Sequence, residues 1–527
     1  MTSSLALLAL AAPLGFLAVV ARALAVPAGN SRSVERLGGH VAWLGVVVAA
    51  AAGGLTVLHG SLESPTLGIG GLGFSIRLDA VSSVMLGMIS LLGAVIVRYS
   101  NTYLDGDDRR GTFLGWLAAT IAAVEILVLA GNLGLLVLAW IVTSLSLHRL
   151  LVFFPDRRRA VVAARKKFIA ARIGDGFLLA GAALLFDRFD TGDLGTIFDG
   201  ALAATGDGLS SPGSVELAAL CFAVAAILKS AQFPTHGWLV EVMDTPTPVS
   251  ALLHAGILNA GPFLVIRMSP VMDGAVASNA LLLVVGGFTA LFASVALLPQ
   301  PTIKVALGYS SAAHMGFMLM VCAIGIYPAA FLHLVAHSFY KAHAFLSSGS
   351  AIDEARAGKL ALPRRLNHPA RVLGSLGLAV AMYLAFALLW GIDLAREPEL
   401  LAIGLILVLG LAQIVAPALD SDGGLAGSVR AGLLAVAVTA AFFVLEGGTH
   451  HLLHGVVPDV TGREPFHLIL LAGVLVAFAT VVLFQILDPA RPRSRRRQVL
   501  AIHMRNGLYA NALLDRAVGA LRAPATR

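Results

Sequence analysis

Several ionisable side chains of this sequence stand inside apolar stretches, where their chemistry suits the transfer of protons or ions. His333, His337 and Lys341 are spaced four residues apart, so a helix places them on one face. Histidine titrates near neutral pH, and a desolvated lysine releases its proton when a neighbouring charge changes. A charge at the centre of a bilayer costs about 2.5–3.5 kcal/mol on insertion scales, so its presence indicates a function. The full set is Glu125, Asp175, Lys229, His254, Lys304, His333, His337 and Lys341.

This set favours a hydrophilic axis through a helical bundle, the arrangement that proton relays use. A single such residue is often only a contact between two helices, but a set spread over several predicted helices is difficult to explain in that way. For His333 and His337 taken alone, the alternative is a pair of core histidines bonded to the backbone. Lys341, one helical turn further on, favours the relay.

A proline-broken polar segment follows one of these residues. Lys229 ends an apolar run, and a segment containing Pro234 separates it from the next apolar run, which contains His254. Non-helical backbone at membrane depth is tolerated only where protein or a wet cavity surrounds it. The pattern therefore predicts a discontinuous helix of the kind found in transporters, with a plain loop between two spans as the alternative.

The elements that must position these residues are predicted to be membrane-spanning helices. The chain of 527 residues is 58% hydrophobic and only 13% charged, with a mean hydropathy of +0.86, which is typical of an all-α polytopic membrane protein. The sequence has no nucleotide-binding glycine motif in a strand-to-helix context and no iron–sulfur cysteine set. We expect about fifteen spans, at residues 4–26, 41–58, 78–99, 113–130, 133–154, 166–186, 215–239, 247–268, 279–298, 303–324, 328–351, 373–392, 400–416, 428–445 and 466–487.

The net charge of +7 is distributed as membrane topology requires, and we do not expect nucleic-acid binding. Basic clusters such as 157–167 and 491–497 fall on one side of the predicted bundle, and the acidic 187–207 loop falls on the other. We therefore expect a multi-pass protein of the bacterial cytoplasmic (inner) membrane, with its N-terminus outside and its C-terminus in the cytoplasm. Residues 488–527 are predicted to form a basic cytoplasmic tail with a short amphipathic helix.

Two polar groups lie near the predicted ends of spans. Glu241 and Asp244 fall on the basic side, and we regard them as candidates for the place where an ion path meets a partner protein. His450, His451 and His454 have the composition of a metal-ligand cluster, but two preceding glycines favour a solvated loop. We therefore predict no metal site in this chain.

The motifs around these residues resemble a known family, the proton-conducting antiporter-like subunits of respiratory complex I and of Mrp-type antiporters. The resemblance covers about residues 70–355, and its motifs are specific in combination. They are Lys229–Leu239, Pro246–Ala255, Arg172–Asp175, Ile303–Ser311 and His333–Ala342.

The resemblance implies two inverted five-helix repeats with discontinuous helices, each repeat forming a half-channel. It implies that Lys229 is the central lysine of the first half-channel and that His254 is its connecting group. Lys304, His333 and His337 would belong to the link and the second half-channel. The implied segments are 1–112 (N-terminal helices), 113–268 (first repeat), 279–416 (second, degenerate repeat), 428–487 (C-terminal helices) and 488–527 (tail).

Departures from the family pattern separate this chain from complex I. The fifth-helix glutamate of the family corresponds to Ile141, for which Glu125 on the preceding helix is a candidate substitute. The twelfth-helix lysine has no counterpart near Asp393. A complete complex I subunit would also continue into a long lateral helix, whereas residues 488–527 follow the last predicted span here. In these features the chain resembles the DabB family, the membrane subunits of bacterial inorganic carbon accumulation complexes.

The DabB resemblance implies a subunit that conducts protons or sodium ions and is not itself an enzyme. Its implied partner is a DabA-like cytoplasmic protein, a zinc-containing relative of β-carbonic anhydrases that would convert carbon dioxide to bicarbonate. The zinc would belong to that partner, and we expect no cofactor in this chain. The alternatives are a proton-pumping subunit of an NADH:quinone oxidoreductase and an Mrp-type sodium/proton antiporter subunit.

Overall fold

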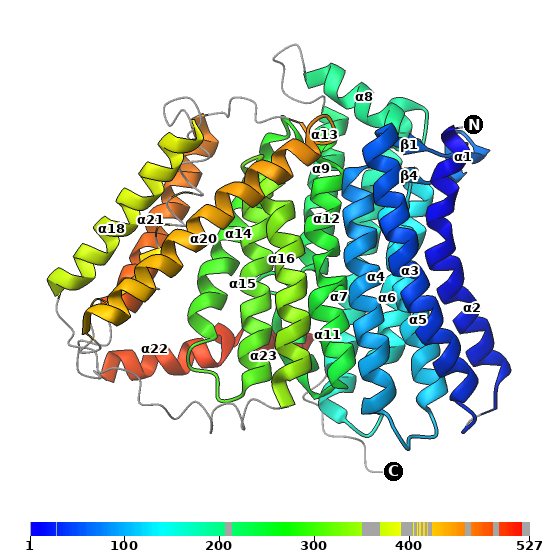
Figure 1. Cartoon of the computed structure of the whole chain (residues 1–527), viewed down its shortest axis with the longest axis horizontal. Helices are drawn as coiled ribbons and strands as arrows, with labels where there is room; N and C mark the ends of the chain where they lie inside the picture. Colours follow the sequence, from blue (N-terminus) through cyan, green and yellow to red (C-terminus); the bar gives the residue numbers. More distant parts are fainter. Residues whose placement is uncertain are drawn as a thin grey trace.

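The chain forms a bundle of long helices that stand side by side, with α2 and α3 at one edge and α18, α20 and α21 at the other (Figure 1). The computed structural model describes residues 2–27, 29–205, 213–349, 369–391, 424–458, 465–487 and 495–518, together with isolated positions between 404 and 419. Within these residues, eleven helices are long and apolar enough to cross a membrane.

The N-terminal part of the bundle is built from helices that follow one another through short connections. Helix α8 is an exception, because it lies across one end of the bundle (Figure 1). The elements are α1 (Thr2–Leu5), η1 (Ala6–Leu10), α2 (Ala11–Ala25), α3 (Arg32–His59), α4 (Ala80–Tyr103), α5 (Arg110–Leu129), α6 (Leu133–Leu151), α7 (Arg158–Phe189) and α8 (Leu194–Thr205).

The central part contains shorter helices that interrupt the regular packing. The elements are α9 (Gly213–Lys229), α10 (Gly237–Glu241), η2 (Val242–Asp244), α11 (Thr247–Ala255), η3 (Ile257–Asn259), α12 (Ala260–Arg267), α13 (Ser269–Met272), α14 (Val276–Ala296), α15 (Ile303–Ala323), α16 (Tyr327–Leu346) and η4 (Ser347–Gly349).

The C-terminal part adds three long helices and then returns beneath the bundle. Helix α22 crosses the end opposite to α8 (Figure 1). The elements are α18 (Pro369–Trp390), α20 (Gly424–Leu453), α21 (Pro465–Leu487), α22 (Arg495–Arg505), η6 (Gly507–Tyr509) and α23 (Ala510–Ala517).

The predicted spans overlap described helices, except 400–416, which lies mostly outside the described residues. Two of them, 215–239 and 247–268, are each divided between two helices. Two predictions about loops are wrong. The 187–207 segment contains α8, because its apolar residues pack on the bundle end, and His450 and His451 lie within α20, whose helix continues to Leu453. Two small antiparallel strand pairs are added between α3 and α4, namely β1 (Leu62–Glu63) with β4 (Arg77–Leu78) and β2 (Leu67–Ile69) with β3 (Leu72–Phe74).

Helix α4 begins at a buried carboxylate that also fixes the end of α12. The Asp79 side chain accepts a hydrogen bond from the Ser82 backbone N–H at 2.9 Å, forming a capping box. Arg267 donates to both Asp79 oxygens, at 2.5 and 3.2 Å. Burial alone would raise the pKa of Asp79, but Arg267 and Arg77 outweigh burial and hold that pKa well below its usual range.

The helix before Pro234 is interrupted, as the sequence predicts. Helix α9 ends at Lys229, and α10 begins only at Gly237. The first residues of the intervening segment are buried, since Ser230 and Gln232 are both 0% exposed, whereas Pro234 is exposed, and the Phe233–Pro234 peptide bond is cis. The burial of Ser230 and Gln232 directly after Lys229 favours the discontinuous helix over the plain loop, because a loop at a membrane surface would be exposed.

A second interruption divides the predicted span 247–268. Helix α11 ends at Ala255, and α12 begins at Ala260 after a short 3₁₀ turn. The two interruptions meet, because Ser230 Oγ lies 3.4 Å from the Leu258 carbonyl oxygen. Gly261 permits this approach, since a Cβ atom there would stand 2.6 Å from the Ala226 carbonyl oxygen.

Candidate ion pathway

The first polar cluster centres on Lys229, the last residue of α9. Its ammonium nitrogen lies 3.4 Å from the Trp140 carbonyl oxygen and 4.1 Å from the centre of the Trp140 ring. The side chain is buried, and its hydrogen-bond acceptor is a neutral group of α6. An ammonium group held in this way keeps a cation–π contact and can exchange a proton without breaking an ion pair.

A second buried lysine, Lys167 of α7, contacts α6 at Ser144, one turn after Trp140. Its Nζ donates to the Ser144 hydroxyl at 2.8 Å and to the Ser144 carbonyl at 2.9 Å. Sequence reasoning missed Lys167, which it assigned to the basic surface cluster. One signal was present, because Lys167 is eight residues before Asp175 and therefore on the same face of α7.

Asp175 lies close to both lysines but is paired with an arginine. Arg172 Nη2 is 2.6 Å from Asp175 Oδ2, one turn away on α7. Lys229 lies within electrostatic range of both members of this pair. The pair therefore places a compensated carboxylate beside the lysines, where its attraction changes with the position of the Arg172 side chain.

Glu125 is buried in α5, and Ser90 of α4 donates to its Oε1 at 2.9 Å. Lys229, in contrast, contacts α6. The structure therefore places Glu125 against α4, and its role as a substitute for the family's glutamate stays a prediction.

The second polar cluster centres on Lys341 of α16. Its Nζ donates to the Ser310 hydroxyl at 2.7 Å and to the Leu307 carbonyl at 3.3 Å. His254 of α11 is fully buried and within electrostatic range of Lys341. The His254 ring stacks on Phe345 at 4.3 Å, and neither of its nitrogens has a hydrogen-bond partner among the described residues.

Three histidines continue this cluster away from Lys341. His314 Nδ1 and His333 Nε2 are 3.0 Å apart, and the His314 ring lies 5.1 Å from that of His337. Sequence reasoning found His333 and His337 but missed His314 on α15. The 3.0 Å contact favours a histidine relay over separate core histidines bonded to the backbone, which was the alternative.

The two clusters adjoin at the interrupted helices. Ser230, next to Lys229, contacts the Leu258 carbonyl, and Asn259 then donates to Ser338 of α16 at 2.7 Å. Ser338 follows His337 in the chain. A line of polar groups therefore runs from the first cluster to the second through the meeting point of the two breaks.

Lys304 lies apart from these clusters. It is half-buried at the start of α15 and donates to Thr247 Oγ1 at 3.1 Å. It lines a surface cavity of about 390 Å³ together with Arg157 and the exposed Asp244. The structure thus groups Lys304 and Asp244 at the bundle end near the basic loops.

Glu241 binds the C-terminal part of the same chain. Lys166 Nζ donates to Glu241 at 2.6 Å and to Asn511 at 2.9 Å, and it also pairs with Asp515. Asn511 donates to Glu241 as well. Helix α23 therefore covers Glu241, whose role as a contact for a partner protein stays a prediction.

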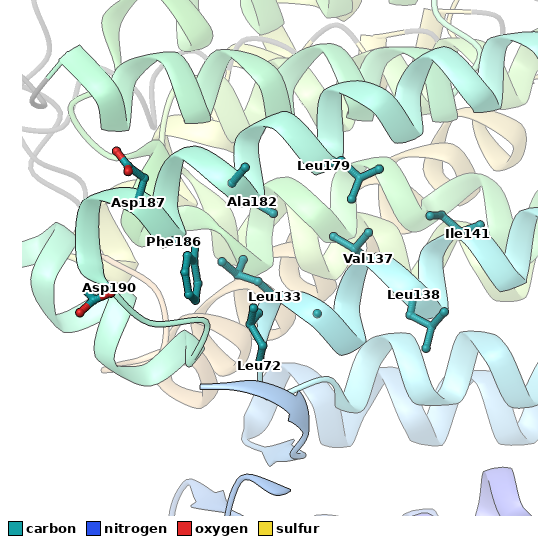
Figure 2. A pocket seen from close by; sticks show the side chains of 12 residues that line it. Leu72, Leu133, Val137, Leu138, Ile141, Leu179, Ala182, Phe186, Asp187 and Asp190 are labelled. Atoms are coloured by element: carbon teal, nitrogen blue, oxygen red, sulfur yellow. The ribbon is translucent and has the colours of Figure 1, made fainter. Parts of the chain in front are cut away.

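The position of the family's fifth-helix glutamate faces outward. Ile141 lines an apolar groove of about 840 Å³ between α6 and α7. Figure 2 shows Leu138, Val137 and Leu179 along the same groove, with Asp187 and Asp190 at its far end. The neighbouring face of α6 carries Trp140 and Ser144, which contact the lysines.

Family profiles match most of the segment that holds these clusters. The family described as NADH:quinone oxidoreductase/Mrp antiporter matches residues 130–392, and that described as NADH-ubiquinone oxidoreductase (complex I), chain 5 N-terminus matches residues 67–114.

Among full-length relatives, the probable inorganic carbon transporter subunit DabB2 of Halothiobacillus neapolitanus is 37% identical over 461 residues, covering 85% of this chain and 81% of the relative. The probable subunit DabB of Hydrogenovibrio crunogenus is 42% identical over 54% of each chain. NADH-quinone oxidoreductase subunit L of Mycobacterium tuberculosis is 34% identical over 53% of this chain and 44% of that protein. The match thus spans four-fifths of the first relative and about half of the others.

Solved structures share the fold over nearly the whole chain. The Mrp complex from Dietzia sp. matches with a TM-score of 0.55 at 23% identity, over 97% of this chain and 64% of that one. The membrane-bound sulfane sulfur reductase, an archaeal respiratory complex, matches with a TM-score of 0.58 at 16% identity, over 97% and 100%. The predicted all-α polytopic fold is thereby confirmed. This chain belongs to the DabB family of inorganic carbon transporter subunits, which carries the antiporter-like membrane module of complex I and Mrp proteins.

Proposed function

We propose that this chain is the ion-conducting membrane subunit of an energy-coupled inorganic carbon accumulation complex. Ion flow through it would drive the hydration of carbon dioxide in a DabA-like, zinc-containing cytoplasmic partner. The observation that carries the proposal is the pair of buried lysine clusters, around Lys229 and Lys341, joined at the broken helices. The zinc and the hydration chemistry belong to the partner in this proposal, and this chain supplies the energy.

The available energy is sufficient for such coupling. One elementary charge that crosses about 100 mV yields about 2.3 kcal/mol, and each pH unit across the membrane adds about 1.4 kcal/mol. One proton therefore biases the hydration equilibrium by roughly a hundredfold or more. The estimate holds only if ions do not leak across the membrane by another route. The path through the lysines must therefore be the only low-energy route for the ion.

The distribution of basic loops supports an orientation in the bacterial inner membrane, with the N-terminus outside and the C-terminus in the cytoplasm. In this orientation the cavity around Lys304 and Asp244 opens to the cytoplasm. Asp244 is exposed there and is our candidate for contact with the partner, whereas Glu241 is covered by α23.

Replacement of Lys229 tests the proposal. The variant Lys229→Ala and its DabA-like partner are co-expressed in a host that requires added carbon dioxide, and growth in air is measured. We expect loss of growth in air, because the central proton-carrying amine is gone. Arg165→Ala is the matched control, since Arg165 is an exposed cation on α7. Growth of Lys229→Ala equal to the control, with the complex intact by co-purification, would contradict the proposal.

A second candidate function is sodium/proton exchange of the Mrp type, which the match over residues 130–392 favours. It predicts that deletion of the gene makes growth sensitive to sodium without creating a requirement for carbon dioxide. The opposite pattern supports the carbon-accumulation function.

A further inference from the structure

One face of α6 presents a regular row of polar contacts. Trp140, Ser144 and His148 are four residues apart, so they lie on one face with a rise of about 6 Å per step. The Trp140 carbonyl meets Lys229, and the Ser144 carbonyl and hydroxyl meet Lys167. Two buried amines are therefore held one helical turn apart by the same helix.

The row continues to His148 in the last turn of α6. The His148 ring packs against Phe168 with 5.1 Å between ring centres, and it is within electrostatic range of Lys167. His148 is only partly buried, while Lys167 is 4% exposed. The three side chains thus lead from the break after α9 to the partly exposed last turn of α6.

The row of Trp140, Ser144 and His148 on α6, with the two lysines that it contacts, has a small set of charged neighbours that matter for proton transfer. Lys167 has Lys229, Arg172 and Asp175 as its charged neighbours, and His148 has Arg149 in addition. The one carboxylate among them, Asp175, is paired with Arg172. The hydrogen-bond acceptors of Lys167 and Lys229 are neutral oxygens of α6, so either amine can change its charge without leaving a separated counter-ion.

We propose that Lys229, Lys167 and His148 form the proton path between the centre of the membrane and the cytoplasmic surface. This inference rests on the proposed function and deepens it. In one step, a proton leaves the Lys229 ammonium and is taken up by the neutral amine of Lys167, directly or through one water molecule. In the next steps the Lys167 ammonium gives its proton to the His148 imidazole, which releases it to water at the surface.

The chemistry of the row selects protons over sodium ions. A lysine ammonium has three hydrogen-bond donors and no acceptor, and metal cations such as sodium bind carboxylate, carbonyl and water oxygens. The oxygens of Trp140 and Ser144 are already bound to the two amines. A sodium ion would have to take these oxygens from the amines and would be repelled by any ammonium group nearby. A proton, in contrast, is carried by the amines themselves.

The test measures proton flux in liposomes that contain the intact complex and a trapped pH-sensitive dye. Lys167→Met and His148→Ala should each reduce the flux at least tenfold. Arg165→Ala, the exposed cation on α7, should leave it unchanged. Added imidazole should restore the flux of His148→Ala, but only from the side where α6 ends, because a small base can replace the missing ring there.

The variants separate this inference from the proposed function. If Lys229→Met abolishes flux while Lys167→Met and His148→Ala conduct normally, the α6 path is wrong and the proposed function survives. If Lys229→Met also conducts normally, the proposed function fails as well. Where Lys167→Met does not assemble, imidazole rescue of His148→Ala decides the matter, since loss of a structural contact is not repaired by a soluble base. Absence of rescue, with the complex assembled, overturns the path.

Discussion

At the scale of single residues, the three buried lysines of the two polar clusters share one mode of binding, whereas the buried Lys166 is paired with Glu241 and Asp515. Lys167 and Lys341 each donate to one hydroxyl and one backbone carbonyl, and Lys229 has a carbonyl and an aromatic ring. A carboxylate in direct contact would hold each amine permanently charged. Neutral acceptors leave both charge states accessible, which is what a proton carrier requires.

Sequence reasoning identified Lys229, His254, His337 and Lys341, because each stands inside a plainly apolar run. It missed Lys167, since the preceding basic residues make the segment read as surface. It also missed His314, which has no ionisable neighbour one turn away on α15 and whose partner is nineteen residues further on. Burial of such residues depends on tertiary packing, which the local pattern does not encode.

Asp79 and Arg267 show the opposite behaviour, that of a permanent ion pair, and they give a prediction for acid stability. The folded-state pKa of Asp79 lies below the unfolded value of about 3.9. The contribution of ionised Asp79 to the free energy of unfolding is therefore complete above the unfolded-state pKa. It is lost as the pH falls through the folded-state pKa. Asp79→Asn leaves Arg267 buried without its counter-ion, so we expect a loss of about 3–5 kcal/mol at neutral pH.

Thermal unfolding in detergent, followed from neutral to acidic pH, measures this effect. The unaltered protein should become less stable below about pH 4, while Asp79→Asn should start lower and change less. Asp105→Asn is the matched control, because Asp105 is 80% exposed in its pair with Arg110. Equal losses of stability for the two substitutions would show that the buried Asp79–Arg267 pair stabilises the fold no more than an exposed pair does.

At the scale of elements, the two interrupted helices organise the pathway. The sequence predicts the break after Lys229, because Pro234 and a run of polar residues mark it. It does not predict the break at Gly256, because isolated glycines and prolines such as Pro262 also occur in continuous membrane helices. The second break forms where α12 must approach the end of α9, a requirement set by packing between segments distant in the chain.

Gly261 tests this close approach. A methyl group there would press on the Ala226 carbonyl and on the Ser230 hydroxyl, so Gly261→Ala must push α12 away from α9. We expect a loss of about 1–3 kcal/mol in stability and reduced proton flux, because the two lysine clusters would separate. Thermal unfolding and the liposome assay measure the two effects. Gly176→Ala, where a Cβ atom meets nothing within 4 Å, is the control, and equal behaviour of both variants would refute the argument.

At the scale of the whole molecule, the C-terminal segment returns beneath the bundle and binds the region of the first break. Asn511 contacts Lys166 and Glu241, and Gly507 lies against His236 and Tyr309. The sequence indicated a short amphipathic helix in the tail, but nothing in it specified contacts with residues so far away in the chain. Such contacts follow from the assembled bundle.

Asn511→Ala should release this segment. Loss of the two amide contacts leaves the Lys166–Asp515 ion pair to join α7 to α23, so trypsin should cleave after Arg505 and Arg516 several times faster. A time course of digestion, read by mass spectrometry, measures the rate. Asn506→Ala is the control, because that side-chain amide donates to the Ile502 carbonyl of the preceding helix α22. Unchanged cleavage in Asn511→Ala would mean that other contacts hold the segment.

The apolar groove that contains Ile141 has a consequence for the assembled machine. Around Ile141 the groove presents leucine, valine and isoleucine, and its two carboxylates, Asp187 and Asp190, lie at the far end, so a lateral neighbour meets no ionisable group of the groove beside Ile141. In the proposed function, charge would therefore not leave through this part of the flank and would move along the direction of the helices, from one aqueous side to the other (Figure 1). A partner protein that uses the energy of this ion flow must then bind at one of the two aqueous ends of the bundle.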